Sequence, residues 1–530
     1  MYCIPSFIIV YMTKKFVFFV SYIILYLCNY CISQKQNVIW CFGDSAGIDF
    51  NNLTIPTPIA TGGDGRGNCT SIADSNGNLL FYATENSNSD AVIYNKNHTL
   101  MANTSGMPSD GYFAGMVIIP KPGSDSLYYL FYRGNPNNVD TFYRAIIDMS
   151  QNNGLGAVIE KNKVIQPISF ADCITAVKHG NGRDWWVIDK YYVTPFTHHN
   201  RFFAYLIKPD TIMPAIIQDF NDMNDGAFQK ICWHPSFNKF MLISIVGYMA
   251  EFDFDRCTGA ISLNRIIFPE QLSNYNRIFW EGAYSPNGNV FYVSRNSYGG
   301  NFGNYNYLLQ YDLTATNIPA SCDTLNFTSY PSADCGAVRL APDGKIYYTH
   351  AYIPTNALNY PYADTMRNYI NENLGVVNNP DVVGPGCNFA PFSFHLGGKR
   401  TYWGLPNNPN YGLGRLYGSS CDTLQWTNLT PALSKGEGVM QITYISAWQK
   451  LFVNASGLKG KNVTVSVYDG RGSLMFEVRG LKSNAGYFTL DVNCAGGLAS
   501  GERGARWPNG LYVVHLQTEK EILSKKFIKE

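Results

Sequence analysis

The segment GAYSPNGNVFYVSRN (Gly282–Asn296) and the later segment GAVRLAPDGKIYYTHAY (Gly336–Tyr352) decide the fold. Each contains an apolar stretch, a tight Asn-Gly or Asp-Gly turn, and a second stretch rich in aromatic residues. These dipeptides accept the positive φ that short turns between strands require, and they are a strong signal for a β-hairpin. The two segments therefore predict two β-hairpins.

The same pattern recurs at intervals of about fifty residues, which indicates a repeat architecture. The other copies lie at Thr70–Thr84, Met116–Arg133, Ile174–Tyr192 and Lys230–Val246, with a weaker copy at Phe392–Asn407. The turns of the seven copies are marked by Gly77, Gly123, Gly182, Asn238, Gly288, Gly344 and Gly398. A four-stranded sheet buries both faces only when it stacks against neighbours. The sequence therefore predicts an all-β fold, a β-propeller of about seven blades. A chain of separate β-sandwiches is the competing interpretation.

Composition agrees with a β-rich protein that has a large core. Of the 530 residues, 46% are hydrophobic, 15% aromatic and 15% charged, which excludes a disordered chain. The formal net charge of +1 gives no basic footprint for DNA or RNA, so no nucleic-acid partner is predicted. Frequent Gly and Pro argue against a long helical protein.

The first 33 residues are typical of a secretory signal peptide. Lys14 and Lys15 precede the apolar run Phe16–Leu27, and small residues allow a cut before Gln34. An uncleaved membrane anchor is the alternative. Ten cysteines follow this segment, and export would place them in an oxidising compartment where disulfides form. Cys335 and Cys387 are one candidate pair, although spacing does not fix connectivity.

The chain changes character after the repeats. We predict a propeller over residues 34–430, a linker over 431–444, and a small antiparallel β-sandwich, Ig-like, over 445–530, because alternating strands joined by Gly turns continue to the end. This tail resembles the C-terminal sorting domain of type IX secretion substrates of Gram-negative bacteria. The resemblance lies in VSVYDGRG (Val465–Gly472), NGLYVVHL (Asn509–Leu516) and KKFIKE (Lys525–Glu530).

The repeat region is similar to the surface propellers that often precede such sorting domains, notably in WCFGDSAGIDFN (Trp40–Asn51) and FDFDRCTGAIS (Phe252–Ser262). The two resemblances imply export, a location at the cell surface or outside the cell, and the type IX secretion machinery as a partner of residues 445–530. Attachment to the outer-membrane surface is compatible with them.

Two motifs favour ordinary structure over chemistry. Gly43-Asp44-Ser45-Ala46-Gly47 matches the G-x-S-x-G of hydrolases, but that motif works on a strand-to-helix turn and no helical pattern follows here. We interpret it as a first propeller strand and turn. Glu251, Asp253 and Asp255 alternate along one strand and offer oxygen ligands for Ca²⁺, although a solvated strand face is the simpler interpretation.

Three acidic residues are the candidate ligand-binding groups. Asp172 and Asp334 each follow an Ala and precede a Cys. Each aspartate lies ten residues before a hairpin glycine, and each cysteine nine. Glu281 holds a comparable place in another repeat. Together with Cys69, Cys173 and Cys387, these positions are expected where innermost strands begin, near the mouth of a central channel. A structural role, with Asp capping turn amides, is the alternative.

The sequence favours binding of a glycan or a protein through loops on one propeller face. No catalytic residue, metal or cofactor is predicted. The alternatives are an extracellular glycan-acting hydrolase or lyase with acids at the channel mouth, and a structural component of the surface or motility apparatus. Paired carboxylates about 5–10 Å apart would favour the enzyme.

Overall fold

The computed structural model describes most of the chain between Lys35 and Lys529, and every structural statement below concerns the described residues. They are residues 35–86, 88–109, 114–136, 139–167, 173–192, 200–220, 229–270, 277–299, 303–329, 333–352, 363–416, 418–422, 440–445, 450–455, 462–469, 474–482, 487–491, 510–518 and 522–529. The predicted signal peptide, residues 1–33, lies outside them. Within this part of the chain, the helices are too short and too polar to cross a membrane.

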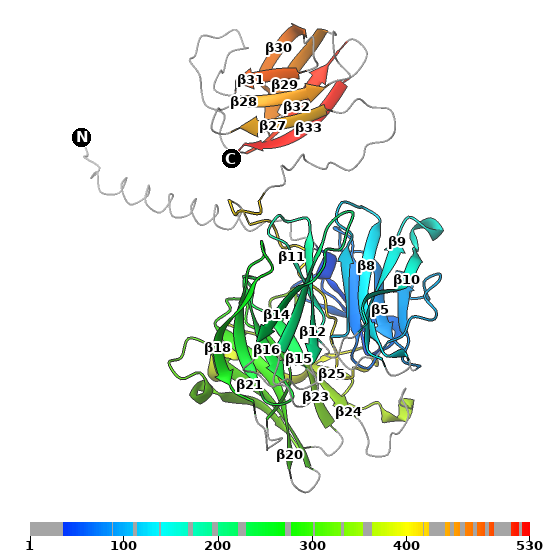
Figure 1. Ribbon diagram of the computed structural model, residues 1–530, viewed down its shortest axis with the longest axis vertical. Coiled ribbons are helices and arrows are strands. Elements are labelled where there is room, and N and C mark those ends of the chain that lie inside the picture. Colours follow the sequence, from blue (N-terminus) through cyan, green and yellow to red (C-terminus); the bar gives the residue numbers. More distant parts are fainter. Residues whose placement is uncertain are drawn as a thin grey trace, which may run out of the picture. The chain divides into compact units, whose positions relative to one another are not determined.

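Seven β-sheets follow one another between Ile39 and His395, each made of antiparallel strands that are consecutive in sequence (Figure 1). The first two sheets have three strands each: β1 (Ile39–Phe42), β2 (Asp44–Asp49), β3 (Thr57–Asp64); β4 (Cys69–Ala73), β5 (Leu79–Glu85), β6 (Ala91–Asn95).

The other five sheets have four strands each. They are β7 (Met116–Pro120), β8 (Leu127–Gly134), β9 (Thr141–Asp148), β10 (Ala157–Gln166); β11 (Thr175–Lys178), β12 (Trp185–Tyr192), β13 (Asn200–Ile207), β14 (Ile216–Phe220); β15 (Gln229–Trp233), β16 (Lys239–Ser244), β17 (Met249–Phe254), β18 (Ile261–Phe268); β19 (Ile278–Tyr284), β20 (Val290–Gly299), β21 (Gly303–Asp312), β22 (Asp323–Thr328); β23 (Ala333–Leu340), β24 (Ile346–Tyr352), β25 (Asn373–Val377), β26 (Phe389–His395). Short 3-10 turns lie between some strands: η1 (Lys35–Asn37), η3 (Asn152–Gly154), η4 (Pro319–Ser321), η5 (Asp364–Met366), η6 (Gly384–Cys387).

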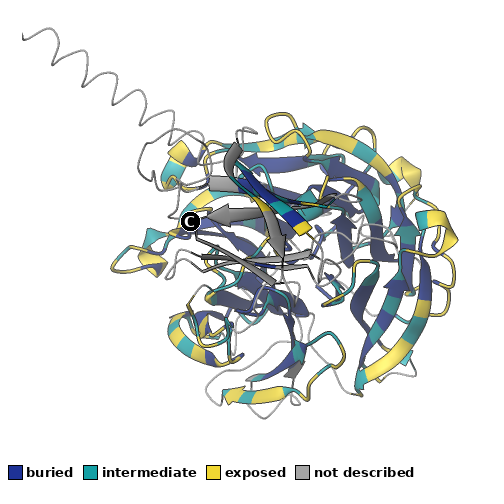
Figure 2. Cartoon of the chain, turned by 90° about the horizontal axis from the view of Figure 1, so that it is seen from above, coloured by how far each residue is buried: buried dark blue, intermediate teal, exposed yellow. Residues whose placement is uncertain are grey.

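The seven sheets form a closed ring, because buried side chains join each sheet to the next. Trp40 of β1 shares one cluster with Tyr82 of β5 and Tyr347 of β24, and the rings of Trp40 and Tyr347 meet edge-on with centroids 6.1 Å apart. The first sheet therefore lies between the second and the seventh. Further clusters link the remaining neighbours around the ring (Figure 2). The fold is a seven-bladed β-propeller, as predicted.

The hairpin turns explain why the repeat was visible in the sequence. Gly77, Gly123, Gly182, Gly288 and Gly344 each connect the first two strands of a sheet and have a positive φ, +77° at Gly288 for example. Glycine takes this conformation without the steric cost that a Cβ brings. In the remaining hairpin the positive φ belongs to Phe237 instead of the predicted Asn238.

One of the seven predicted hairpins is wrong. The segment Phe392–Asn407 holds the end of β26, an outer strand, and then leaves the sheets, so Gly398 does not connect two strands. The missing blade is the first sheet, which precedes every predicted hairpin. Its β1–β2 turn at Gly43 has a φ of +59° but carries no Asn-Gly or Asp-Gly dipeptide, so the hairpin repeat did not include it, although the segment was interpreted as a first propeller strand and turn.

After β26 the chain forms a segment that we call the strap, residues 396–416 and 418–422. It begins beside the first sheet, where the Asp44 amide donates to the Arg400 carbonyl at 2.9 Å. It ends beside the fourth and fifth sheets, where the Leu416 amide donates to the Gly180 carbonyl at 2.7 Å and Cys421 forms a disulfide with Cys257. The strap therefore links opposite parts of the ring.

A second compact unit begins at Thr423. It contains two antiparallel sheets, with the strand orders β27-β28-β31 and β30-β29-β32-β33. The strands are β27 (Met440–Ile445), β28 (Lys450–Ala455), β29 (Asn462–Asp469), β30 (Leu474–Lys482), β31 (Tyr487–Asp491), β32 (Gly510–Gln517) and β33 (Ile522–Lys529). Strand β27 lies mostly within the predicted linker 431–444, which is therefore too long at its C-terminal end. The Ig-like sandwich remains a prediction.

Candidate functional site

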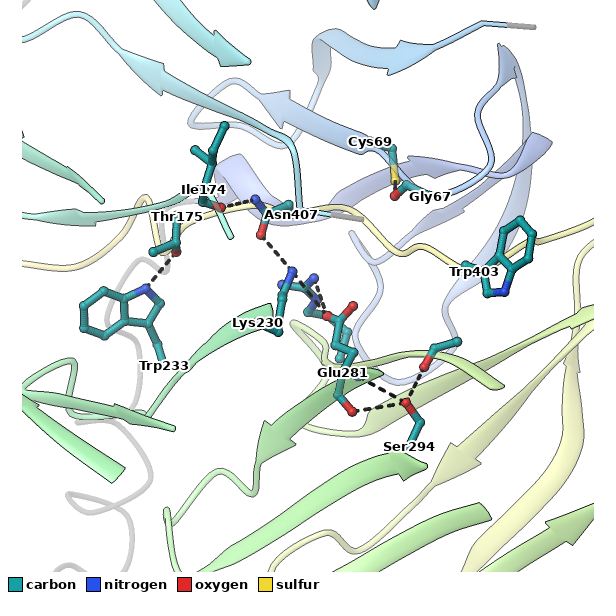
Figure 3. Close-up of polar contacts among 12 residues, drawn as sticks. Gly67, Cys69, Ile174, Thr175, Lys230, Trp233, Glu281, Ser294, Trp403 and Asn407 are labelled. Carbon is teal, nitrogen blue, oxygen red and sulfur yellow. Dashed lines mark hydrogen bonds and ion pairs between the residues drawn. The ribbon is translucent and has the colours of Figure 1, made fainter. Parts of the chain in front are cut away.

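The axis of the propeller is occupied by the strap, and Asn407 is its central residue (Figure 3). Its side-chain nitrogen Nδ2 donates to the carbonyls of Met116 at 3.0 Å and Ile174 at 2.8 Å. Its backbone amide donates to the Cys69 carbonyl at 2.8 Å, and its Oδ1 accepts from Lys230 Nζ at 3.2 Å. These partners belong to the inner edges of four successive sheets. The side chain thus connects three blades, and the backbone amide of the same residue adds a fourth.

Glu281, a predicted ligand-binding residue, continues this network to two more blades. Its Oε1 lies 2.5 Å from a terminal nitrogen of Arg339 on β23 and 3.6 Å from Lys230 Nζ on β15. The side chains of Glu281 and Lys230 are 2% and 4% exposed. Burial lowers the pKa of Lys230, and so does the Arg339 charge, while Glu281 acts in the opposite direction. Glu281 therefore balances the buried cation of Lys230 and the partly buried cation of Arg339, whose side chain is 19% exposed.

Asp334 and Asp172, the other predicted residues, differ in what the structure describes. Asp334 accepts hydrogen bonds from Asn296 Nδ2 and, at 3.2 Å, from Nε1 of Trp403 in the strap. Desolvation by burial raises the pKa of its carboxyl group, and these hydrogen bonds counteract the rise. Asp172 lies outside the described residues. No hydrogen bond or ion pair in the described part of the chain joins Glu281 to Asp334, so the two do not form one constellation.

The predicted Cys335–Cys387 disulfide is not formed. Cys335 and Cys387 are both free, while Cys257 and Cys421 form a disulfide with a Cα–Cα distance of 5.3 Å. The candidate was wrong because Cys387 does not begin an inner strand. It ends η6, which precedes the outer strand β26, whereas Cys335 lies on the innermost strand β23.

The G-x-S-x-G segment forms the β1–β2 hairpin, as its simpler interpretation predicted. Ser45 Oγ donates to Asp44 Oδ1 at 3.2 Å, and Asp44 Oδ2 lies 2.9 Å from Arg400 Nε and 3.3 Å from Arg367 in an ion-paired group. A hydrolase nucleophile requires a strand-to-helix turn, which this hairpin does not provide. The segment instead ties the first blade to the strap.

The three alternating carboxylates are also bound within the protein. Glu251 is buried between Lys239 at 3.2 Å and Arg265 at 3.0 Å. Asp253 accepts from Asn264, and Asp255 accepts from the Cys257 amide of its own turn. Among the residues that the structure describes, no group of three or more His, Cys, Asp or Glu is placed to hold a metal ion.

A different group is exposed on the sixth blade. Strands β20 and β21 are ten residues each, and the rings of Tyr305 on β21 and Phe327 on β22 stack with centroids 5.9 Å apart and planes 18° apart. Tyr305 is 37% and Phe327 51% exposed. Tyr307 is the cross-strand partner of Phe327, and the centroids of their rings are 5.2 Å apart. Together with Phe268, Arg277 and Arg295, these residues form what we call the aromatic–arginine cluster.

Alternation along β21 places these rings on one face of the sheet. Leu309 and Tyr311, on the same face as Tyr305 and Tyr307, are covered by residues that include Phe268 of the fifth blade. Tyr305 lies beyond this covered part, nearer the end of the long β20–β21 hairpin. Single exposed apolar residues are common on protein surfaces, whereas apolar residues exposed side by side more often mark an interaction site.

Two arginines border these rings. The Arg295 guanidinium lies over the Tyr307 ring at 4.3 Å, and that of Arg277 lies over the Phe268 ring at 4.5 Å. Desolvation lowers the pKa of Arg277, Tyr311 raises it, and the charge of Arg295 lowers it further. In the described part of the chain, neither arginine forms an ion pair, and the buried Nε of Arg295 has no hydrogen-bond partner. The cluster therefore combines exposed aromatic rings with two guanidinium groups that form no ion pair within the described residues.

The sequence contained a signal for this cluster that the repeat analysis did not use. NYNYLLQYD (Asn304–Asp312) alternates Tyr305, Tyr307 and Tyr311 with polar or aliphatic residues. The pattern predicted only a third strand of a blade. Which tyrosine remains exposed depends on how far the neighbouring blade extends, and this is a property of the folded ring.

Comparisons with known proteins support no family assignment. No family model matches the chain, and no curated protein matches its sequence. Similar solved structures include the proposed 6-phosphogluconolactonase of Bacteroides uniformis (12% identity, TM-score 0.41), which covers 68% of this chain and 98% of that one. The Dos1 propeller has 14% identity and a TM-score of 0.37, over 70% and 86% of the two chains.

A third similar structure is the periplasmic gluconolactonase of Pseudomonas aeruginosa, with 8% identity and a TM-score of 0.34 over 76% of this chain and 94% of that one. The assignment of the propeller fold rests on the sheet topology. These similarities carry no argument about the activity of this chain.

Proposed function

We propose that this chain is an exported carbohydrate-binding protein whose propeller holds its ligand at the aromatic–arginine cluster. The observation that carries the proposal is the exposed stack of Tyr305 and Phe327. The face of an aromatic ring is negative, and the C–H groups on one side of a pyranose are weakly positive, so the two surfaces attract. Two exposed and nearly parallel aromatic rings suit a sugar residue better than they suit a protein partner. Stable protein interfaces bury about 1,200–2,000 Å², which is far more than two rings supply.

Export is part of the same proposal. The Cys257–Cys421 disulfide supports it, because such bonds persist in oxidising compartments and are rare in the cytosol. The resemblance of the tail to type IX sorting domains supports passage across the outer membrane, with the secretion machinery as partner of residues 445–530. The final location would be the cell surface or the medium.

Glycan-array binding by the purified full chain tests the carbohydrate proposal. We expect Tyr305→Ala and Phe327→Ala each to weaken binding about tenfold, because each removes one stacked ring. Ile217→Ala on β14 is the matched control, since Ile217 is 56% exposed on another blade. The absence of binding across a broad panel, or equal losses in the control, would overturn the proposal.

Deletion of residues 423–530 tests the sorting proposal, because the second compact unit begins at Thr423 and β27 pairs with β28. A shorter deletion from residue 445 would leave most of β27 without its partner strand. We expect the truncated chain to remain in the periplasm with its Cys257–Cys421 bond formed. Unchanged surface display would contradict the assignment of a sorting signal.

A further inference from the structure

We propose that the carbohydrate is acidic, with a carboxylate or sulfate group bound by Arg295 and Arg277 while a sugar ring stacks on Tyr305 and Phe327. This inference rests on the proposed carbohydrate-binding function and specifies the chemical class of the ligand. The acidic character of the ligand is inferred from the two arginines, whereas carbohydrate binding itself is inferred from the two aromatic rings.

Arg277 is held in place by contacts with neutral groups. Its Nε donates to the Gly247 carbonyl at 2.9 Å, and one terminal nitrogen donates to the Pro269 carbonyl at 2.6 Å. Neutral carbonyls orient the guanidinium but do not neutralise it. Stacking on Phe268 at 4.5 Å further restricts its position. The protein thus holds one fixed positive charge at the edge of the cluster.

Arg295 provides the second charge and an unused donor. It is half-buried, it lies over the Tyr307 ring at 4.3 Å, and its buried Nε donates to no acceptor in the described residues. Because this Nε is itself buried, the terminal nitrogens, which are not among the buried unpartnered atoms, are the part of Arg295 that would meet a ligand oxygen. A planar guanidinium also matches the two oxygens of a carboxylate or sulfate.

The two arginines are close enough to affect each other. Burial is the main cause that lowers the pKa of Arg277, and the charge of Arg295 lowers it further, as repulsion between two cations in a partly buried place does. An anionic group near both would relieve this repulsion and gain two charge-assisted contacts. Neutral sugars would stack equally well on the rings but would leave this electrostatic cost in place.

Matched oligosaccharides distinguish acidic from neutral ligands. The probes are oligogalacturonate, its methyl ester, a sulfated galactan oligosaccharide and the same oligosaccharide after desulfation, each titrated into the full chain by calorimetry. We expect the carboxylated or the sulfated probe to bind at least tenfold more tightly than its neutral partner. Which acidic probe prevails identifies the source of the negative charge.

Substitution of Arg295 localises the effect. Arg295→Gln is expected to abolish the preference for the acidic probe while weak binding of the neutral probe remains, and Arg295→Lys is expected to retain part of the preference. Arg201→Gln removes an exposed arginine of another blade, where it pairs with Asp219 at 2.6 Å, and should leave the preference unchanged. A thermal melt of each variant reports on folding.

The outcomes separate the two proposals. Equal binding of acidic and neutral probes, lost on Tyr305→Ala, would overturn the acidic ligand and leave carbohydrate binding intact. An acidic preference that Arg295→Gln does not change would overturn the assignment to these arginines. Binding of no carbohydrate at all would overturn the proposed function itself.

Discussion

Asn407 donates its side-chain amide to the Ile174 carbonyl at 2.8 Å, although 233 positions separate the two residues in sequence. The same amide reaches Met116, and Lys230 donates to its oxygen. When a buried hydrogen bond is broken, the donor or acceptor that is left without a partner destabilises the folded state by its desolvation free energy. The strap is therefore a structural part of the ring.

Replacement of Asn407 by Leu should destabilise the propeller. It leaves the Met116 and Ile174 carbonyls without this donor and removes an acceptor from Lys230. At about 1–3 kcal/mol for each unsatisfied group, we expect a loss of about 3 kcal/mol or more in urea unfolding followed by tryptophan fluorescence. Asn410→Leu on the exposed part of the strap is the control, and a similar loss there would contradict the assignment.

Glu281→Gln should be more damaging than removal of an exposed carboxylate. The substitution leaves Lys230 and Arg339 without their shared counter-charge, and breaking a buried pair typically costs about 3–5 kcal/mol. Glu160→Gln is the matched control, because the Glu160 side chain is 39% exposed in its pair with Arg144 and such surface pairs contribute at most about 1 kcal/mol. Equal effects on the free energy of unfolding would refute the structural role of Glu281.

Reduction of the Cys257–Cys421 bond should lower the melting temperature of the wild-type protein. The bond joins positions 164 residues apart, and disulfides that close long loops typically contribute about 2–4 kcal/mol. A double variant with Cys257→Ser and Cys421→Ser should melt at the lower temperature with or without reductant. Cys322→Ser, which removes an exposed free thiol, should behave as wild type.

Stability should fall in mild acid because of His350 on β24. Burial lowers the pKa of His350 from 6.5 to about 3. The unfolded chain therefore binds a proton below about pH 6.5 that the folded chain does not bind until about pH 3, so stability is full above pH 6.5 and declines as the pH falls. At pH 5 the loss from this group is about 2 kcal/mol.

His350→Phe should remove this part of the pH dependence, because phenylalanine carries no titratable group and keeps an aromatic ring beside those of Tyr348 and Phe392, whose centroids lie 4.3 Å and 4.7 Å from that of His350. The measurement is the free energy of unfolding at pH 7.5 and pH 5 for wild type and variant. His395→Phe, at an exposed position, should keep the wild-type difference. An unchanged difference in His350→Phe would show that other groups dominate.

The sequence predicted the blades because their decisive signals are local. Turn glycines such as Gly288 and Gly344 sit between alternating strands, and the need for positive φ is met within a few residues. The strap had no such signal. Its segment YWGLPNNPNYGLG (Tyr402–Gly414) has the glycine, proline and asparagine content of a loop, and nothing in it indicates that Asn407 reaches four blades.

The candidate site was harder to predict for a related reason. Acidic residues such as Glu281 were correctly placed on inner strands, but Lys230 and Arg339 come from other blades, and only the folded ring shows that they bind its carboxylate. The exposure of Tyr305 likewise depends on the reach of the adjacent blade. Both features arise from relations between repeats, which the pattern of a single repeat does not contain.

A propeller with an open central channel could let small molecules pass through, but in this protein Asn407 and the strap fill the centre. A small molecule could pass through the propeller only if the strap gave up its hydrogen bonds to the blades. The far end of the strap would meanwhile stay attached through the Cys257–Cys421 disulfide. Any molecule that this protein meets must therefore be received on its outside surfaces, and changes in specificity are expected to accumulate there.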